Sequence, residues 1–232
     1  LDRLERQFAS RIRAELTRAM LEMLDVYELT GEVPTPRDHH ESLERIYQAL
    51  AIASATTFGA RVIDMGKAAG RTLETKDFAG TMARLALSYV ASEMIRRRIV
   101  SISETTRSQI VAGIARGYAA GLGVADIARQ IRDVVPLRSE SRAAMIARTE
   151  THGAANFGAN EAARETGLNL RREWIAAEDA RTRETHDAAN GQIVGMDEPF
   201  DIGGALLMYP GDPDGPPEET INCRCAVGFI AD

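Results

Sequence analysis

The C-terminal part of the chain carries two histidines and two cysteines, side chains that bind metal ions. Cys223 and Cys225 stand one residue apart, and His152 and His186 precede them. In an extended segment, residues two apart point to the same side, so the two thiols would face one partner together. Two imidazole nitrogens and two thiolates are a donor set for tetrahedral zinc. One hypothesis is therefore a zinc site with four ligands: His152, His186, Cys223 and Cys225.

The alternative is a metal-free arrangement of the same side chains, and we favour it. A single residue between the cysteines is tighter than the usual spacing of zinc ligands, and the two histidines lie on different elements. Buried thiols can pack as small apolar side chains, with the histidines hydrogen-bonded to carboxylates or backbone carbonyls. We therefore expect no cofactor, with zinc as the alternative. Under both hypotheses the segments around residues 152, 186 and 223–225 converge.

Polar residues around the histidines form a second pattern. Arg148, His152 and Asn156 follow one another at intervals of four and so share one face of a helix. We interpret them as part of a buried hydrogen-bonded network, because buried polar side chains are usually paired. The arginines at positions 148 and 183 are expected to bond to Glu150, Asp179 or backbone carbonyls. The full predicted network comprises Arg148, Glu150, Asn156, Asp179, Arg181, Arg183 and Asn222.

A nucleophilic role for the cysteines has less support. His186 could act as a base toward Cys223 or Cys225, which leaves a metal- or Cys/His-dependent hydrolase as an alternative function. Reactive cysteines commonly lie at helix starts, whereas these two stand in a segment rich in turn residues. The sequence has no glycine-rich phosphate loop, no paired-histidine helix motif and no Gly-x-Ser-x-Gly motif. We therefore expect no enzymatic activity.

Hydrophobic periodicity predicts that the first part of the chain is helical. Over residues 1–29 one apolar face recurs, and we expect it to bind a partner protein, since such a helix is marginal alone: Leu4, Phe8, Ile12, Leu16 and Met20. Helices are predicted over residues 41–73 and 77–99, and another starts at an N-cap, Ser103. A short helix from Val124 is expected to close at Pro136. The last helix is expected over residues 139–166.

The pattern changes after Gly167. Residues 168–175 alternate between apolar and polar side chains, which predicts a strand. A short helix capped by Asp179 and ending at Gly191 is expected next. Short apolar pieces at 192–194, 205–208 and 225–230 lie between glycines and prolines, which is typical of a loop-rich module. The predicted fold is α+β and mostly α, with a long helical arm over residues 1–135 and a small loop-rich α/β domain over residues 136–232.

Composition and charge narrow the function classes. Of the 232 residues, 44% are hydrophobic and 27% are charged, which is ordinary for a globular protein. No apolar run approaches the roughly 20 residues of a membrane span. Residues 1–135 carry 19 basic and 17 acidic groups, whereas residues 136–232 carry 9 and 17. The acidic part repels nucleic acid, so a DNA contact would use the arginine triplet 96–98, which we interpret as a solvated helix end.

Five motifs in the C-terminal part carry a resemblance to a known family. In chain order they are Ala147-Arg-Thr-Glu150 with His152 and Asn156; Trp174-Ile-Ala; Asp179-x-Arg-Thr-Arg-x-x-His186 with Gly191-Gln192; Tyr209-Pro-Gly-Asp212; and Pro217-Glu-Glu-x-x-Asn-Cys-Arg-Cys225. In these motifs the chain resembles the phage Mu F-like minor head protein family, also called phage head morphogenesis proteins. The resemblance covers about residues 140–230 and identifies residues 136–232 as a Mu F-like head morphogenesis domain.

The resemblance implies a minor structural protein of a tailed-bacteriophage head that acts in head morphogenesis. Such a protein is made in the host bacterial cytoplasm and enters the virion at the portal vertex or in the capsid interior. The implied partners are the portal protein, the major capsid protein or both, together with other copies of the chain. Packaged DNA is kept as a further partner, although the charge of the chain does not indicate DNA binding. No contact with a membrane is implied.

Two other functions are kept as alternatives to the structural role. One is a metal- or Cys/His-dependent hydrolase or nuclease that acts within the head, and the other is an internal DNA-organising protein. The resemblance also implies that some relatives carry an appended toxin, such as an ADP-ribosyltransferase. Because Asp232 follows the family-like stretch directly, we expect no toxin domain in this chain.

Overall fold

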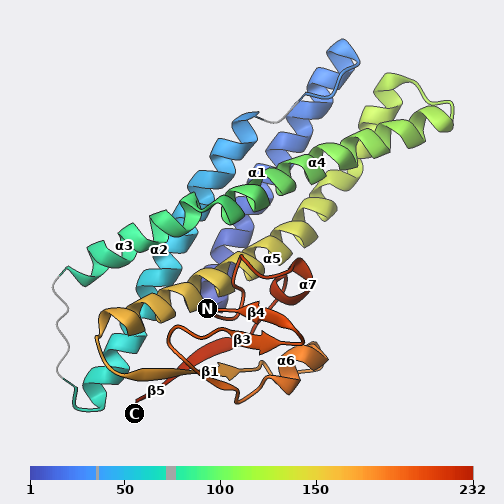
Figure 1. Ribbon diagram of the computed structural model, residues 1–232. Helices are drawn as coiled ribbons and strands as arrows, with labels where there is room; N and C mark the ends of the chain where they lie inside the picture. The colour runs from blue at the N-terminus through green and yellow to red at the C-terminus, as the bar shows by residue number, and fades with distance from the viewer. Residues whose placement is uncertain (35–36, 72–76, 232) are drawn as a thin grey trace.

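The structure, a computed structural model, describes residues 1–34, 37–71 and 77–231. Long helices form an elongated bundle over the first two thirds of the chain (Figure 1): α1 (Asp2–Thr30), α2 (Arg37–Ala68), α3 (Phe78–Ala91), α4 (Glu93–Ala119) and α5 (Val124–Glu165). Within the described ranges, none of these helices is both long and apolar enough to cross a membrane.

After α5 the chain forms a small module of short strands and helices at one end of the bundle (Figure 1). Its elements are β1 (Leu170–Ile175), α6 (Glu184–Ala188), β2 (Ile193–Gly195), β3 (Phe200–Ile202), β4 (Ala205–Leu207), α7 (Pro217–Thr220) and β5 (Ala226–Ala231). The order β2-β1-β5 gives an antiparallel sheet with β1 at its centre, and β3 and β4 form a separate hairpin. The predicted α+β, mostly α class is therefore confirmed.

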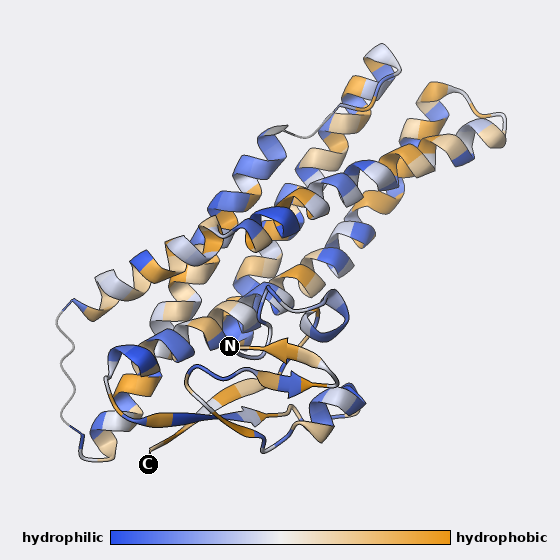
Figure 2. Ribbon diagram, in the orientation of Figure 1, coloured by the Kyte–Doolittle hydropathy of each residue, from blue (hydrophilic) through white to orange (hydrophobic). Residues whose placement is uncertain are grey.

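The α5 helix connects the bundle to the C-terminal module. Its first half packs with α1 and α4 around Leu24, Ile114 and Ile131, in what we call the distal half of the bundle. Its second half packs on α1, α2 and α4 around buried residues such as Leu43 and Ala147. A third cluster fills the module itself. Figure 2 shows apolar residues on the inward faces of the helices, as amphipathic helices require.

The predicted role of the apolar face of α1 is wrong. Phe8, Ile12, Leu16 and Met20 are at most 1% exposed, because they form the core between α1 and the neighbouring helices. Leu4 packs at the edge of the same core. The periodicity correctly indicated a buried face, but the surface that covers it belongs to this chain rather than to a partner protein.

Two predicted helix boundaries are also wrong. The helix expected over residues 77–99 is broken at Ser92, whose hydroxyl caps α4 by accepting a hydrogen bond from the backbone N–H of Ile95. Ser103 is not a cap but lies inside α4, where its hydroxyl donates to the Ile99 carbonyl. The predicted helix 41–73 corresponds to α2, and its last two residues lie outside the described residues. The arginine triplet 96–98 therefore begins α4 rather than ending a helix.

The prediction that a helix ends at Pro136 is wrong. Pro136 lies inside the continuous α5. A proline within a helix costs about 3 kcal/mol because it removes a hydrogen bond and crowds the preceding turn. Burial of Ile131 and Val135 before it and Ala143 after it offsets this cost. The predicted boundary between residues 135 and 136 falls within this helix. The division into two domains stays a prediction. The last residue of the predicted second domain, Asp232, lies outside the described residues.

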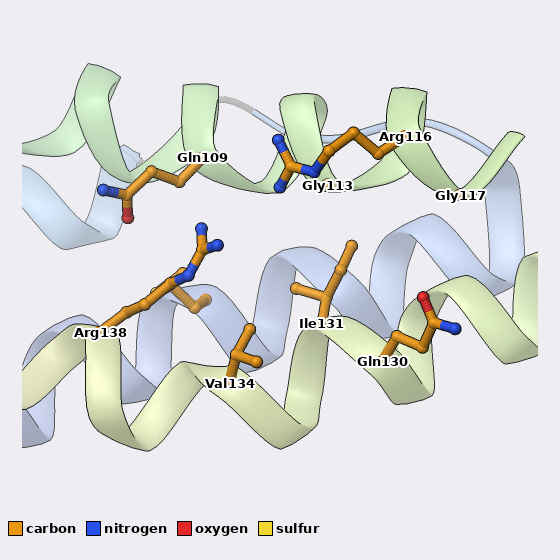
Figure 3. Close-up of a pocket in the computed structure, with 9 residues that line it drawn as sticks. Gln109, Gly113, Arg116, Gly117, Gln130, Ile131, Val134 and Arg138 are labelled. Carbon is orange, nitrogen blue, oxygen red and sulfur yellow. The ribbon is translucent and has the colours of Figure 1, made fainter. Parts of the chain in front are cut away.

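Glycines set the distance between α4 and α5. A Cβ atom on Gly117 would lie 2.4 Å from Cγ1 of Ile127, and one on Gly113 would lie 2.9 Å from Cδ1 of Ile131. Figure 3 shows Ile131 pointing from α5 toward this stretch of α4. Beside this contact the two helices leave a cavity of about 320 Å³, lined in part by Arg116 and Arg138.

Candidate functional site

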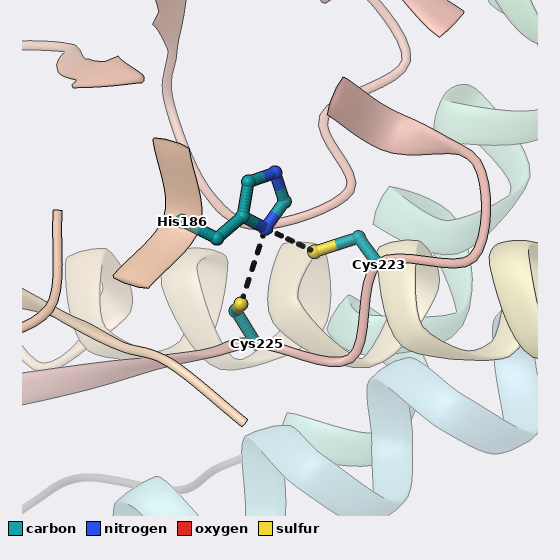
Figure 4. Close-up of side chains that lie close together, drawn as sticks. All are labelled: His186, Cys223 and Cys225. Atoms are coloured by element: carbon teal, nitrogen blue, oxygen red, sulfur yellow. Dashed lines mark hydrogen bonds between the residues drawn. The ribbon is translucent and has the colours of Figure 1, made fainter. Parts of the chain in front are cut away.

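One imidazole and two thiols meet inside the C-terminal module (Figure 4). His186 comes from α6, and Cys223 and Cys225 come from the segment between α7 and β5. The Nδ1 atom of His186 lies 3.3 Å from Sγ of Cys225 and 3.7 Å from Sγ of Cys223. Each of the three residues is only 2% exposed. We call these three residues the His-Cys cluster.

The chain around the cysteines turns so that both thiols face inward. Asn222 has a left-handed backbone with φ of 59°, and its N–H donates to the hydroxyl of Thr149 on α5 at 3.0 Å. Arg224, between the cysteines, points the other way and pairs with Asp179, with 2.6 Å between Nη2 and Oδ1. The alternation of an extended segment therefore separates a buried pair of thiols from an exposed ion pair.

A carboxylate that the sequence analysis did not identify fixes the His186 ring. The Oε2 atom of Glu219 on α7 lies 2.9 Å from Nε2 of His186 and accepts a hydrogen bond from the hydroxyl of Thr185 at 2.9 Å. A carboxylate can only accept, so Nε2 carries a hydrogen and Nδ1 is the atom that faces the sulfurs. The Trp174 ring packs edge-to-face against the imidazole, with 5.4 Å between the ring centroids.

The two thiols are electrostatically unequal. The hydrogen bond from Cys223, opposed by burial and assisted by contact with His186, lowers the pKa of Cys225 to about 5. The same shared hydrogen bond, followed by burial, raises the pKa of Cys223. The shared hydrogen bond therefore favours the thiolate form at Cys225 and the protonated form at Cys223.

His152 lies outside the His-Cys cluster. Among the described residues, the group of close donor atoms comprises His186, Cys223 and Cys225 without it. His152 sits half-buried on α5, where burial, together with the charges of Arg148 and Arg224, lowers its pKa to about 4. The four-ligand site that the sequence suggested is thus reduced to three donors, because α5 presents His152 to a cationic environment instead.

The lowered pKa of His152 predicts a loss of stability in mild acid. The unfolded chain, with an ordinary histidine pKa near 6.5, binds a proton before the folded chain does. The free energy of unfolding should therefore fall as the pH decreases from about 6.5 to about 4. His152→Gln should reduce this fall in urea unfolding at pH 7 and pH 5. An equal fall in the variant and the parent would contradict the assignment.

The residues of the predicted polar network have partners that differ in part from those expected, and of the seven only Glu150 and Asn156 are buried. Arg183 donates to the backbone carbonyl of Ile221, as predicted. Arg148 pairs instead with Glu5 on α1 at 3.0 Å and donates to the Asn222 amide oxygen at 3.4 Å. The network therefore holds the N-terminal helix against the module, which the sequence analysis did not anticipate.

Glu150 and the first arginines of α4 form another link. Arg98 donates to Glu150 at 3.4 Å and to the hydroxyl of Thr220 at 3.0 Å, so the solvated interpretation of the triplet is wrong for this residue. Burial raises the pKa of Glu150, and the nearby charge of Arg98 opposes this shift. Both residues line a mostly apolar cavity of about 430 Å³ between α4, α5 and residues 213–221.

The side chains of Asn156 and Asp179 form hydrogen bonds with backbone groups of the module. The Asn156 amide donates to the carbonyls of Pro210 and Cys225, at 2.9 and 3.0 Å, and its oxygen accepts from the N–H of Val227. Asp179 accepts from the N–H of Arg181 in a turn, and the helix that it was expected to cap begins only at residue 184. The side chain of Arg181 is exposed.

Arg172 forms a hydrogen-bonded network in the module that the sequence analysis did not predict. It is fully buried on β1 and donates to carbonyls of Gly195, Glu198 and Met208 and to the side chain of Asn160. Along β1 it shares a face with Leu170 and Trp174. An arginine in phase with two large apolar residues was the signal that could have identified it.

The burial of these groups indicates a structural site. A nucleophile must reach its substrate, whereas all three side chains of the His-Cys cluster are 2% exposed. The two cysteines also belong to the apolar cluster of the module, with Trp174 and Phe200, and the His186 ring packs edge-to-face against Trp174. The arrangement can hold α6, α7 and β5 together through polar or metal-mediated contacts, but it offers no exposed reacting atom.

Comparison with models of protein families gives a match described as "Phage Mu protein F like protein" over residues 108–228. These residues run from the middle of α4 to β5. They therefore include the whole His-Cys cluster and every member of the predicted polar network.

Three curated proteins are similar over part of their length. The minor head protein GP7 of Bacillus phage SPP1 is 34% identical over 128 residues, covering 54% of this chain and 41% of that protein. The NAD(+)–arginine ADP-ribosyltransferase EFV of Enterococcus faecalis is 32% identical over 146 residues, covering 62% of this chain and 30% of that protein. YqbB of Bacillus subtilis is 28% identical over 116 residues. The matched regions span less than half of the length of these relatives. No solved structure matches the chain.

Proposed function

This chain belongs to the family of Phage Mu protein F like proteins, and we propose from this membership that it is a minor structural protein of a tailed-phage head. The observation that carries the proposal is the family match over more than half of the chain, together with its similarity to a protein named as a minor head protein. We place the protein in the virion, at the portal vertex or in the capsid interior. Its proposed partners are the portal protein, the major capsid protein or both.

The architecture is suited to a structural role. The polar groups of the module mostly satisfy one another, so that Arg172, Asn156 and Glu219 hold strands, turns and short helices in one arrangement. A rigid module carried on a long bundle presents surfaces at fixed positions, which an assembly of repeated subunits needs. The distal half of the bundle offers such a surface.

Contacts with other head proteins must use surfaces other than the buried face of α1. The distal half exposes several large apolar side chains: Val26, Leu29, Val111, Tyr118, Val134 and Leu137. Leu29 is 86% exposed and Leu137 is 70% exposed. Exposed large apolar side chains can contribute to surfaces that bind other proteins. The proposed docking surface for head partners is therefore the distal half of the bundle.

Coexpression with the portal and major capsid proteins of its own genome tests this function. The full chain should sediment with assembled heads. A double variant, Leu29→Glu with Leu137→Glu, should lose most of this association while keeping its thermal stability, because both side chains are exposed. The matched control is Leu206→Glu, since Leu206 is 65% exposed on β4 of the module.

The outcomes separate the two parts of the proposal. Loss of association by the control alone would move the docking surface to the module. A parent chain that does not sediment with heads at all would contradict the structural role. Deleting α1 would not serve as a test, because its removal would open the core of the bundle.

We propose no ADP-ribose transfer by this chain, although one relative is named for that activity. The similarity covers 30% of that relative. In the described part of the chain, the His-Cys cluster of the module and Glu150 on α5 are buried. A structural role requires none of them to meet a substrate.

A further inference from the structure

We propose that the His-Cys cluster binds one thiophilic divalent metal ion, for which zinc is the natural occupant. The ligands are Nδ1 of His186 and the Sγ atoms of Cys223 and Cys225. These three atoms all lie within 4.8 Å of one another in the described structure. The proposal goes beyond the role in the phage head and does not depend on it.

The spacing of the donor atoms fits a tetrahedral ion without rearrangement of the chain. With bonds of about 2.3 Å to sulfur and 2.0–2.1 Å to nitrogen, two donors on one zinc lie about 3.6 Å apart. The observed separations between His186 Nδ1 and the two sulfurs are 3.3 and 3.7 Å. Figure 4 shows the ring nitrogen facing both sulfurs from the opposite side of a small gap.

The hydrogen-bond partners of His186 are arranged like those of metal-bound histidines. Such a histidine almost always donates its other ring N–H to a carboxylate or carbonyl, which fixes the ring. Here Glu219 accepts from Nε2 of His186 at 2.9 Å, and the Thr185 hydroxyl holds the same carboxylate oxygen. This arrangement directs the lone pair of Nδ1 toward the sulfurs.

A bound ion would add a direct link between α6 and the segment between α7 and β5, which hydrogen bonds already join. His186 lies in a helix of five residues, and the cysteines precede β5. The site is buried among Trp174, Phe200 and Leu207, where soft ligands favour zinc over magnesium or calcium. Among the described residues the group supplies three ligands, so a fourth position is left for a water molecule or another small ligand.

Cobalt binding to the chain of 232 residues tests the proposal directly. Co²⁺ in a tetrahedral site with two thiolates gives sulfur-to-metal charge-transfer absorption and intense visible bands. We expect both signals to saturate at one equivalent of Co²⁺ and to disappear when one equivalent of zinc is added. Zinc, but not magnesium, should also protect both thiols of the parent chain from alkylation. This second readout needs no variant.

Variants identify the ligands. Cys223→Ser and Cys225→Ser should each remove much of the charge-transfer signal, and Glu219→Gln should weaken zinc binding by about 10- to 100-fold, as second-shell changes do. His152→Ala is the matched control and should retain one equivalent, because His152 lies outside the cluster. Absence of the cobalt signal and of thiol protection in the parent chain would overturn the proposal. Loss of binding in the His152 variant alone would also overturn the ligand assignment.

Discussion

Replacing Arg172 with methionine is expected to destabilise the protein by about 3–5 kcal/mol, because several buried carbonyl oxygens lose their donor at a cost of about 1–3 kcal/mol each. Arg172 is fully buried, and its guanidinium joins segments that are distant in sequence. It donates to the Gly195 carbonyl at 3.0 Å, to the Glu198 carbonyl at 2.5 Å and to the Asn160 oxygen at 3.3 Å. Methionine fills a similar volume but leaves these acceptors buried without donors.

Chemical denaturation measures this effect, and the module offers a matched control. Arg181→Ala removes an exposed arginine from the same region, and it should change the free energy of unfolding by less than about 0.5 kcal/mol. Arg172→Lys should not restore stability, because an ammonium group cannot reach acceptors on both sides of a planar fork. A methionine variant as stable as the parent would show that the carbonyls find other partners or water.

Local sequence signals predicted the elements where local and tertiary preferences agree. The strand expected over residues 168–175 is found as β1, and the chain is mostly helical, as its composition indicates. The failures occur where distant packing decides. Pro136 signals a helix end locally, but burial of Val135 and Ala143 keeps α5 continuous. Similarly, α1 was assigned an external partner because the sequence alone does not reveal which segment covers an apolar face.

The candidate site was predictable from residue types and not from geometry. The pairing of His186 with two cysteines followed from the chemistry of their side chains, whereas the exclusion of His152 depends on how α5 is rotated. Glu219 follows Pro217 and Glu218 in a polar segment and has the pattern of an exposed acid. It becomes the partner of His186 only because α7 lies against α6. Long-range contacts of this kind leave no periodic signal in the sequence.

The second large effect is expected at Gly158, where α5 passes close to the backbone of α2. A Cβ atom at this position would lie 2.2 Å from Cα and 2.8 Å from the carbonyl oxygen of Ala55. These are backbone atoms of a long helix, so they cannot move aside as the end of a side chain can. Small residues such as Ala154 and Ala162 continue this contact along α5. Any larger residue must therefore push the two helices apart.

Gly158→Ala should lower the free energy of unfolding by about 2 kcal/mol, a cost at the upper end of overpacking less the helix gain. Alanine gains about 1 kcal/mol over glycine in a helix, but overpacking commonly costs 1–3 kcal/mol and more where backbone must shift. Gly113→Ala is the control, because its Cβ would come nearest to side-chain atoms, Cδ1 and Cγ1 of Ile131 at 2.9 and 3.0 Å, so that the helix gain and the cost of moving this side chain should nearly cancel. Urea unfolding of both variants separates the gain in helix propensity, which both share, from the clash with the α2 backbone, which only Gly158→Ala creates. If Gly158→Ala were as stable as Gly113→Ala, α2 and α5 could not be in backbone contact, and the core that positions the module would have to be arranged differently.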